Sequence, residues 1–323
     1  MIAGTGSAVP ARVMTNKEFE SLVDTTDEWI QQRTGIRERR VCSPEETTGS
    51  LSLIASQRAL QASGVSAEEL DLVVMATVTG DYPWPATACF IQSELGAHSA
   101  GAFDVSAACA GFIYALAIGS SMIEAHQVRK ALVIGADCLT KLINWSERST
   151  AILFGDGAAA CVLTAERNTD RGLIATVLKS DGNGTKHILM ERGGNKHPLC
   201  LPESADKSAH IFMAGREVYR FAIIAMGDAC EAVLEKAGVC PGEVDLFVPH
   251  QANLRIIEAA ARRLGLPDEK VFVNVDRYGN TSGASIPLAL DEAVREGRLK
   301  PGMLVLTVGF GAGLVWGANL IKW

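Results

Sequence analysis

The stretch DVSAACAGF, residues 104–112, joins a short apolar segment to a long apolar run. This order of residue types predicts a strand over 102–105, a tight turn of small residues and a buried helix over 112–123. Cys109 then lies at or near the N-terminus of that helix, where the helix dipole and unpaired N–H groups favour a thiolate. Free cysteines are usually buried and inert, so this stretch by itself makes Cys109 a candidate nucleophile and no more.

The overall composition is that of an ordinary globular protein. The chain has 323 residues, of which 48% are hydrophobic and 21% are charged, which is enough for two domains or one large one. The net charge of −7 argues against a nucleic-acid-binding protein. Any site for an anion therefore requires a local basic patch.

The cysteines and the first residues predict a cytoplasmic location. None of the eight cysteines forms a CxxC pair, and most lie in apolar segments, as is typical of a reducing compartment. Residues 1–6 contain neither a basic leader nor an apolar signal segment. The helix expected after Cys109 is interrupted by Gly-Ser-Ser at 119–121 and is too short to span a bilayer. We therefore expect no membrane association.

The second half of the sequence resembles the first. Residues 67–74 (AEELDLVV) are similar to residues 241–248 (PGEVDLFV), at an offset of roughly 174 residues. Residues 132–135 (LVIG) are similar to residues 304–307 (LVLT), at an offset of roughly 172, and the strand expected before Cys109 aligns with 271–275. Matches in the same order at nearly constant spacing indicate an internal duplication of βαβ-type units.

The duplication predicts an α/β protein of two similar halves, with the active site where they meet. Apolar density drops around residue 168, and residues 180–210 are polar, glycine-rich and irregular, which predicts a surface excursion. We place the N-terminal half at 1–167 and the C-terminal half at 168–323. A long helix is expected at 215–237 and a buried strand at 72–79.

Two polar turns downstream are candidates to face Cys109. In VPHQAN, residues 248–253, a buried strand ends at His250, and the carboxyl ends of strands open toward ligand crevices in α/β folds. A surface histidine in a turn is an equally good local interpretation. In GNTSGAS, residues 279–285, Asn280 precedes a helix, and plain capping by Ser282 is the alternative. The duplication places the Asn280 turn where Cys109 lies in the first half.

A glycine-rich turn follows near the C-terminus. VGFGAG, residues 308–313, lies between two expected strands, and its backbone N–H groups could bind an oxyanion. It is not a dinucleotide-binding loop, because a strand at 314–321 follows it instead of a helix.

Taken in order, four motifs are similar to those of β-ketoacyl-acyl-carrier-protein synthase III, a family of the thiolase superfamily. They are DVSAACAGF, VPHQANLRI, YGNTSGASIPLAL and VGFGAGLVWG, and TTDEWIQQRTGI near the start extends the resemblance to essentially the whole chain. The resemblance implies a thiolase fold with five layers, αβαβα, a homodimer, and a catalytic triad of Cys109, His250 and Asn280. The family's last loop usually reads Gly-Phe-Gly-Gly-Gly, and this chain has Ala312 at the fourth position. An oxyanion hole of the Cys109 and Ala312 amides remains possible if Ala312 avoids positive φ.

The resemblance also implies the reaction. An acyl primer, expected to be acetyl, passes from coenzyme A to Cys109 and is then condensed with malonyl-acyl carrier protein, which initiates fatty-acid synthesis. Decarboxylation of malonyl produces an enolate, which the His250 Nε2–H and the Asn280 amide would bind. The resemblance implies no metal and no redox cofactor, since the coenzyme A thioester is a substrate.

Further residues are assigned by the same resemblance. Trp29 lies close in sequence to four arginines, a pattern that a packed helix followed by a solvated charged turn would also explain. The resemblance implies that Trp29 and Arg148 lie on either side of the coenzyme A adenine. It also implies that Arg33 lies near the coenzyme phosphates. Trp84 would reach across a dimer and close the far end of the partner's acyl pocket. Three further arginines are expected to contact the acidic carrier protein: Arg220, Arg255 and Arg262.

Other functions remain open at this point. A type III polyketide synthase or another acyl-coenzyme-A condensing enzyme of a specialised pathway also uses Cys-His-Asn, but such synthases usually have longer chains and lack the HQAN arrangement. A non-condensing acyltransferase of this fold would release no carbon dioxide. A catalytically inactive binding protein would be expected to lack one of the three triad residues, and none is missing.

Overall fold

The computed structural model describes residues 1–167, 169–206 and 208–323, and two β-sheets form its centre. In the first sheet the strand order is β1-β7-β6-β4-β5, with β4 parallel to both β5 and β6 and with β1 and β7 antiparallel to their neighbours. Its strands are β1 (Ile2–Ala8), β4 (Leu72–Ala76), β5 (Gly101–Val105), β6 (Lys130–Cys138) and β7 (Asp156–Thr164).

The second sheet repeats this arrangement. Its order is β8-β13-β12-β11, with β11 parallel to β12 and the other pairs antiparallel. Its strands are β8 (Gly172–Ser180), β11 (Leu246–Pro249), β12 (Leu304–Gly311) and β13 (Val315–Lys322). The strand expected at 271–275 is wrong: a single bridge joins Phe247 to Val271, and a short helix already begins at Val275.

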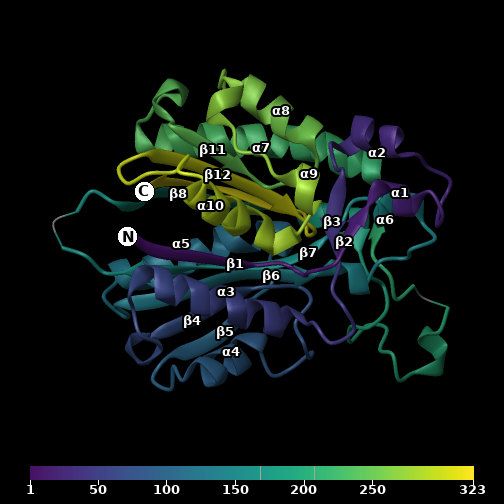
Figure 1. Cartoon of the computed structure of the whole chain (residues 1–323), viewed down its shortest axis with the longest axis horizontal. Helices are drawn as coiled ribbons and strands as arrows, with labels where there is room; N and C mark the ends of the chain where they lie inside the picture. Colours follow the sequence, from purple (N-terminus) through teal and green to yellow (C-terminus); the bar gives the residue numbers. More distant parts are fainter. Residues whose placement is uncertain (168, 207) are drawn as a thin grey trace.

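Helices cover both sheets and fill the space between them, which gives the five predicted layers (Figure 1). The central layer contains α5 (Gly111–Glu124) and α10 (Ser285–Arg295). The outer layers contain α3 (Thr48–Ser63) and α4 (Thr87–Leu95) on the first sheet and α7 (Gly215–Ala237) and α8 (Leu254–Arg263) on the second sheet. The layered order αβαβα is therefore confirmed.

The remaining elements are short and lie at the edges of this core. They are β2 (Val13–Thr15), α1 (Asn16–Phe19), α2 (Asp27–Thr34), β3 (Glu38–Arg40), α6 (Arg148–Ala151), β9 (Ile188–Leu189), β10 (Phe212–Met213) and α9 (Val275–Tyr278). Eight 3₁₀ segments are found in the described residues: η1 (Ala67–Glu69), η2 (Ala108–Ala110), η3 (Leu139–Lys141), η4 (Gly182–His187), η5 (Pro202–Ser204), η6 (Pro241–Glu243), η7 (Asp268–Lys270) and η8 (Ser282–Ala284).

The position of α5 follows from its sequence. A helix that is apolar on every side is stable only where protein surrounds it, and α5 contacts strands of both sheets. Phe112, Ile113 and Leu116 are all fully or almost fully buried. The N-terminus of this helix, and Cys109 with it, is thereby held in the centre of the molecule.

The two sheets are formed by successive parts of the chain. The first sheet uses residues 2–164 and the second uses residues 172–322. The division into 1–167 and 168–323 stays a prediction, because residue 168 lies outside the described residues.

Within the described residues, no helix is both long enough and apolar enough to cross a membrane.

Candidate active site

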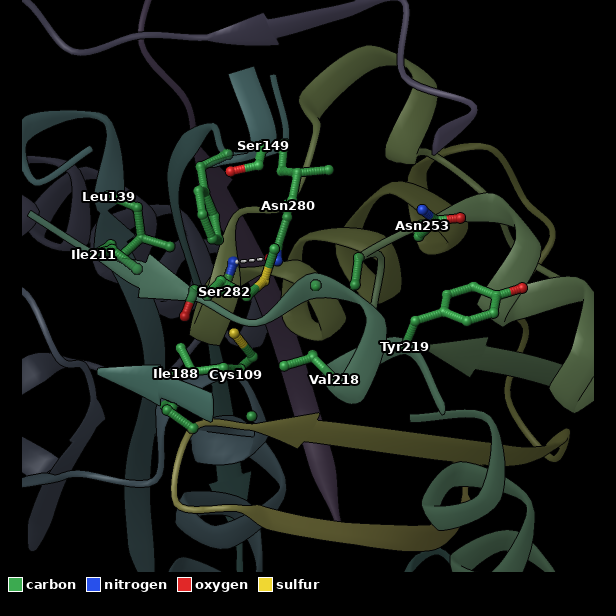
Figure 2. A pocket seen from close by; sticks show the side chains of 18 of the residues that line it. Cys109, Leu139, Ser149, Ile188, Ile211, Val218, Tyr219, Asn253, Asn280 and Ser282 are labelled. Carbon is green, nitrogen blue, oxygen red and sulfur yellow. Dashed lines mark hydrogen bonds between the residues drawn. The ribbon is translucent and has the colours of Figure 1, made fainter. Parts of the chain in front are cut away.

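Residues from both halves of the chain line one cavity of about 650 Å³. Cys109 comes from the segment before α5, His250 follows β11, and Asn280 precedes η8. Figure 2 shows Cys109, Asn280 and Ser282 gathered at the centre of this pocket. The structure therefore brings the three predicted triad residues together.

Cys109 lies in η2, two residues before Gly111, the first residue of α5, so it is near the helix N-terminus as the sequence predicts. The end of β12 passes close over this turn. A Cβ atom at Gly311 would lie 2.6 Å from the backbone nitrogen of Cys109 and 2.9 Å from the Cβ atom of Ala108. Only glycine at 311 allows the end of this strand to come so near the nucleophile.

Burial determines the protonation state of the Cys109 thiol. Desolvation is the largest effect and, with the hydrogen bonds of Ser282 and Asn280 opposing it, raises the pKa of Cys109 to about 12. The prediction of a thiolate stabilised by the helix N-terminus is therefore wrong for the resting protein. The side chain is only partly covered, so a substrate in the pocket can reach the sulfur.

His250 is held at the end of β11 by contacts on several sides. Its backbone N–H donates to the Val308 carbonyl at 2.7 Å, and its ring packs edge-on against Phe310 at a centroid distance of 5.5 Å. Its Nδ1 lies 2.6 Å from the Ser285 hydroxyl. Desolvation lowers the pKa of His250 to about 3, so the imidazole is neutral at physiological pH.

The residue after the histidine anchors the turn, a role that the sequence analysis did not assign. The Gln251 side chain donates to the carbonyls of Pro249 and Phe272 at 2.8 and 3.1 Å. Its Oε1 accepts from the backbone N–H groups of Asn274 and Val275 at 2.9 and 3.2 Å. All the usual hydrogen-bonding positions of this buried amide are thus used, and its place beside His250 in HQAN was the signal for it.

Asn280 is held by both its backbone and its side chain. Its N–H donates to Leu153 O at 2.8 Å, and its carbonyl accepts from Gly155 N at 3.0 Å. The close packing requires glycine at 155, where a Cβ atom would lie 2.2 Å from the Tyr278 carbonyl oxygen. The Asn280 Oδ1 accepts from Ser282 N at 2.8 Å, which leaves the Nδ2 donor for the pocket.

Behind Cys109, a buried carboxylate that the sequence analysis missed joins the two halves. Asp137 Oδ1 accepts from Thr77 Oγ1, Val78 N and Thr79 Oγ1, and its Oδ2 accepts from Gly283 N at 3.0 Å. These bonds turn the chain after Ala76, so β4 ends there and not at Thr79 as expected. Burial raises the pKa of Asp137.

Ala312, which stands where the family usually has glycine, does not have the positive φ that would count against its backbone N–H as an oxyanion donor. Among the described residues other than glycine, positive φ occurs at Ala108, His126 and Ser282. Ala312 lines the pocket together with Cys109. The condition set for an oxyanion hole of these two amides is therefore met, and the hole itself stays a prediction.

Two family models match the chain. 3-Oxoacyl-[acyl-carrier-protein] synthase III matches residues 103–182, and the model of its C-terminal part matches residues 234–323. The β-ketoacyl-[acyl-carrier-protein] synthase III of Caldanaerobacter subterraneus subsp. tengcongensis is 49% identical over 323 residues, which are 100% of this chain and 97% of that protein. The chain belongs to the 3-oxoacyl-[acyl-carrier-protein] synthase III family. As a member it is an acyltransferase-type condensing enzyme, as predicted.

Solved structures of this family share the fold. The 3-oxoacyl-[acyl-carrier-protein] synthase III of Aquifex aeolicus is 46% identical with a TM-score of 0.92, over 100% of this chain and 99% of that one. The priming β-ketosynthase of the R1128 polyketide pathway is 40% identical with a TM-score of 0.93, over 99% of this chain and 95% of that one. The predicted thiolase fold is confirmed.

Of the residues expected to contact coenzyme A, Trp29 and Arg33 line the pocket, and Arg148 lies beside them. The Arg148 guanidinium lies 4.6 Å from the centre of the Trp29 ring, and that of Arg33 lies 5.7 Å from it. Arg148 also donates to Asp24 O at 2.6 Å. Because Arg148 covers the indole directly, a base can lie between these two side chains only after Arg148 moves.

The other predicted contacts lie outside this pocket. Trp84 is 82% exposed and is not among the residues that line the cavity. The three arginines Arg220, Arg255 and Arg262 are exposed, and none has an ion pair within the described residues. The neighbouring Arg263, by contrast, is neutralised by Asp228 and Glu231 at 2.7 and 2.6 Å.

The segment 180–210, expected to be a surface excursion, also contributes to the pocket. Its sequence is polar and irregular, yet Ile188, Leu189 and Met190 line the pocket, as does Ile211 just beyond it. The excursion therefore provides an apolar wall of the cavity, and a few apolar residues within a polar segment were the signal.

Proposed function

We propose that the enzyme condenses an acyl-coenzyme A primer with malonyl-acyl carrier protein through an acyl-Cys109 intermediate. The observation that supports this best is the convergence of Cys109, His250 and Asn280, from three separate segments, on one cavity. The proposed chemistry uses side chains and backbone amides, and coenzyme A enters as part of a substrate.

In the first half-reaction the Cys109 sulfur attacks the thioester carbonyl of the primer. The carbonyl oxygen becomes an oxyanion bound by the amides of Cys109 and Ala312. The carbon–sulfur bond to coenzyme A then breaks, and the leaving thiolate takes up the proton that Cys109 loses. Since the resting thiol is protonated, its deprotonation forms part of the barrier to this step.

In the second half-reaction malonyl-acyl carrier protein occupies the same pocket. The electrons of its bond to the carboxylate form an enolate as carbon dioxide leaves, and the enolate carbon attacks the acyl carbon on Cys109. The new carbon–carbon bond forms as the Cys109 sulfur leaves. Negative charge develops on the thioester oxygen, where the His250 Nε2–H and the Asn280 Nδ2–H act as neutral donors.

The charge of these donors suits an anionic substrate. His250 is neutral because of burial, and an amide at 280 avoids the repulsion that a carboxylate would exert on malonate. We place the adenine between Trp29 and a displaced Arg148, and the phosphates near Arg33.

The test is a panel of acyl-coenzyme A primers with malonyl-acyl carrier protein, scored by release of radioactive carbon dioxide. We expect primer-dependent release and a β-ketoacyl product on the carrier protein. Acyl transfer without carbon dioxide would contradict the proposal. Preference for a primer used by a specialised pathway would favour the polyketide-type alternative, for which the priming β-ketosynthase at 40% identity is the precedent.

We also propose a cytoplasmic homodimer in which the loop at 80–86 meets the partner. The exposure of Trp84, Tyr82 and Phe90, at 82%, 60% and 40%, leaves an aromatic surface uncovered in the single chain. Trp84 lies between two prolines, which restrict where its indole can move.

Trp84→Ala is expected to shift the primer preference toward longer chains. An indole at the end of the partner's acyl pocket shortens that pocket, and each methylene left unburied forgoes about 0.8 kcal/mol. Wild type should therefore prefer acetyl or propionyl primers, and the variant should raise octanoyl turnover relative to acetyl by roughly tenfold. Tyr82→Ala in the same loop is the control. An unchanged primer profile would show that Trp84 only packs in the dimer contact.

Arg255→Glu is expected to raise the KM for malonyl-acyl carrier protein by roughly fivefold while acylation by acetyl-coenzyme A stays nearly unchanged. The carrier protein is acidic, and Arg255 is an exposed cation without an ion pair within the described residues. Steady-state kinetics with each substrate measure both effects. Arg129→Glu is the matched control, because Arg129 lines a second cavity that shares no residue with the active-site pocket. Equal losses with both substrates would indicate a structural role for Arg255.

A further inference from the structure

A buried serine contacts the catalytic histidine from behind. Ser285 is the first residue of α10 and is 1% exposed. Its hydroxyl lies 2.6 Å from Nδ1 of His250 and 3.1 Å from the backbone nitrogen of Gln251. These are the two hydrogen bonds that the Ser285 side chain makes in the described part of the chain.

The two contacts determine which way the hydroxyl proton points. The Gln251 N–H can only donate, so it occupies a lone pair of the Ser285 oxygen. The hydroxyl proton then has one neighbouring acceptor, the Nδ1 of His250. A proton on Nδ1 would instead leave the buried hydroxyl without an acceptor, which disfavours that arrangement by roughly tenfold or more.

We propose that Ser285 is a positioning residue that keeps the proton of neutral His250 on Nε2. Because burial keeps the imidazole neutral, the ring carries one proton, and the two tautomers are the only alternatives. With the Ser285 hydroxyl donating to Nδ1, the other ring nitrogen is a permanent donor.

The fold itself does not require a hydroxyl at this position. The two halves correspond at an offset of roughly 174 residues, and the counterpart of Ser285 at the first position of α5 is Gly111. There, a Cβ atom added at Gly111 would lie 2.9 Å from the Cβ atom of Ala76, and the neighbours found for it in the described part of the chain include no histidine. The hydroxyl at this position is therefore present in the half that carries His250 and is missing from the corresponding position of the other half.

The tautomer of His250 determines which of the two half-reactions this side chain can assist. An Nε2–H donates to the enolate oxygen, and the same nitrogen has no lone pair with which to accept the Cys109 proton. Loss of Ser285 should therefore damage decarboxylation and spare acylation. This consequence rests on the proposed role of His250 in binding the enolate.

The test combines spectroscopy with kinetics on the full chain. In nitrogen-15 NMR of histidine-labelled protein, protonated and unprotonated ring nitrogens give well separated signals, and His250→Ala identifies those of His250. We expect an unprotonated Nδ1 and a protonated Nε2 in wild type, a mixture of tautomers in Ser285→Ala, and the wild-type pattern in Ser285→Thr. Decarboxylation should fall roughly tenfold in Ser285→Ala and recover in Ser285→Thr, while acyl-Cys109 formation stays within about twofold.

Ser56→Ala is the matched control, because Ser56 is fully buried in α3 and its hydroxyl has no hydrogen-bond partner in the described residues. It should change neither measurement. A proton on Nδ1 in wild type, or an unchanged spectrum in Ser285→Ala, would overturn the inference. A changed tautomer with unchanged decarboxylation would support the assignment of Ser285 and contradict the proposed role of His250.

Discussion

Cys109→Ser will abolish formation of the acyl-enzyme, with a loss of roughly a thousandfold or more in rate. A serine hydroxyl has no comparable anionic fraction at neutral pH, and the other groups in the pocket cannot replace the nucleophile. Intact mass spectrometry after incubation with acetyl-coenzyme A should show one acetyl adduct on wild type and none on the variant. Peptide mapping should place that adduct on the Cys109 peptide.

Cys161→Ala is the matched control for this experiment. Burial raises the pKa of Cys161 to about 12, as it does that of Cys109, but Cys161 lies in β7 and does not line the pocket. The control should acylate normally, and an adduct on any other cysteine would contradict the assignment. In wild type the acylation rate should rise with pH throughout the range in which the protein is folded, because the thiolate fraction grows up to a pKa of about 12. A plateau near neutral pH would contradict the raised pKa.

His250→Ala and Asn280→Ala will each lower decarboxylation of malonyl-acyl carrier protein by roughly a hundredfold or more. Each variant removes one neutral donor from the position where the enolate oxygen develops charge. Acyl-enzyme formation should survive, because the oxyanion of the first step is bound by the backbone amides of Cys109 and Ala312. Release of radioactive carbon dioxide from preformed acyl-enzyme measures the second step, and mass spectrometry measures the first.

Two further variants sharpen this prediction. Asn280→Asp should be at least as damaging as Asn280→Ala, since it replaces a donor by a charge that repels malonate. His98→Ala removes an exposed histidine that does not line the pocket and should leave both steps unchanged. Failure of either triad variant chiefly at acylation would show that the proposed division of roles is wrong.

Much of the architecture could be predicted because its signals are local. The apolar run after Cys109 predicts α5, and the long helix expected at 215–237 corresponds to α7 with the observed bounds. The repeated segments predicted two similar halves, and the order of the strands in the two sheets corresponds to that expectation. The order of four motifs sufficed to identify the family.

The tertiary structure decided the features that depend on contacts between the halves. The end of β4 depends on Asp137, which also binds Gly283 in the other half, and the strand expected at 271–275 is reduced to one bridge. The pKa of Cys109 was predicted in the wrong direction, because a helix dipole can be inferred from the position of a residue but desolvation depends on everything packed around it.

The roles of Gln251 and Ser285 illustrate the same limit at the active site. The sequence shows which residue types are present and predicts that His250 follows a strand, which was sufficient to propose the triad. The tautomer of that histidine depends on a hydroxyl 35 positions further along the chain. The sequence by itself thus determined the helices α5 and α7, the two similar halves and the catalytic residue types. Only the tertiary structure decided their protonation and orientation, because burial and hydrogen bonds between distant segments exist only in the folded chain.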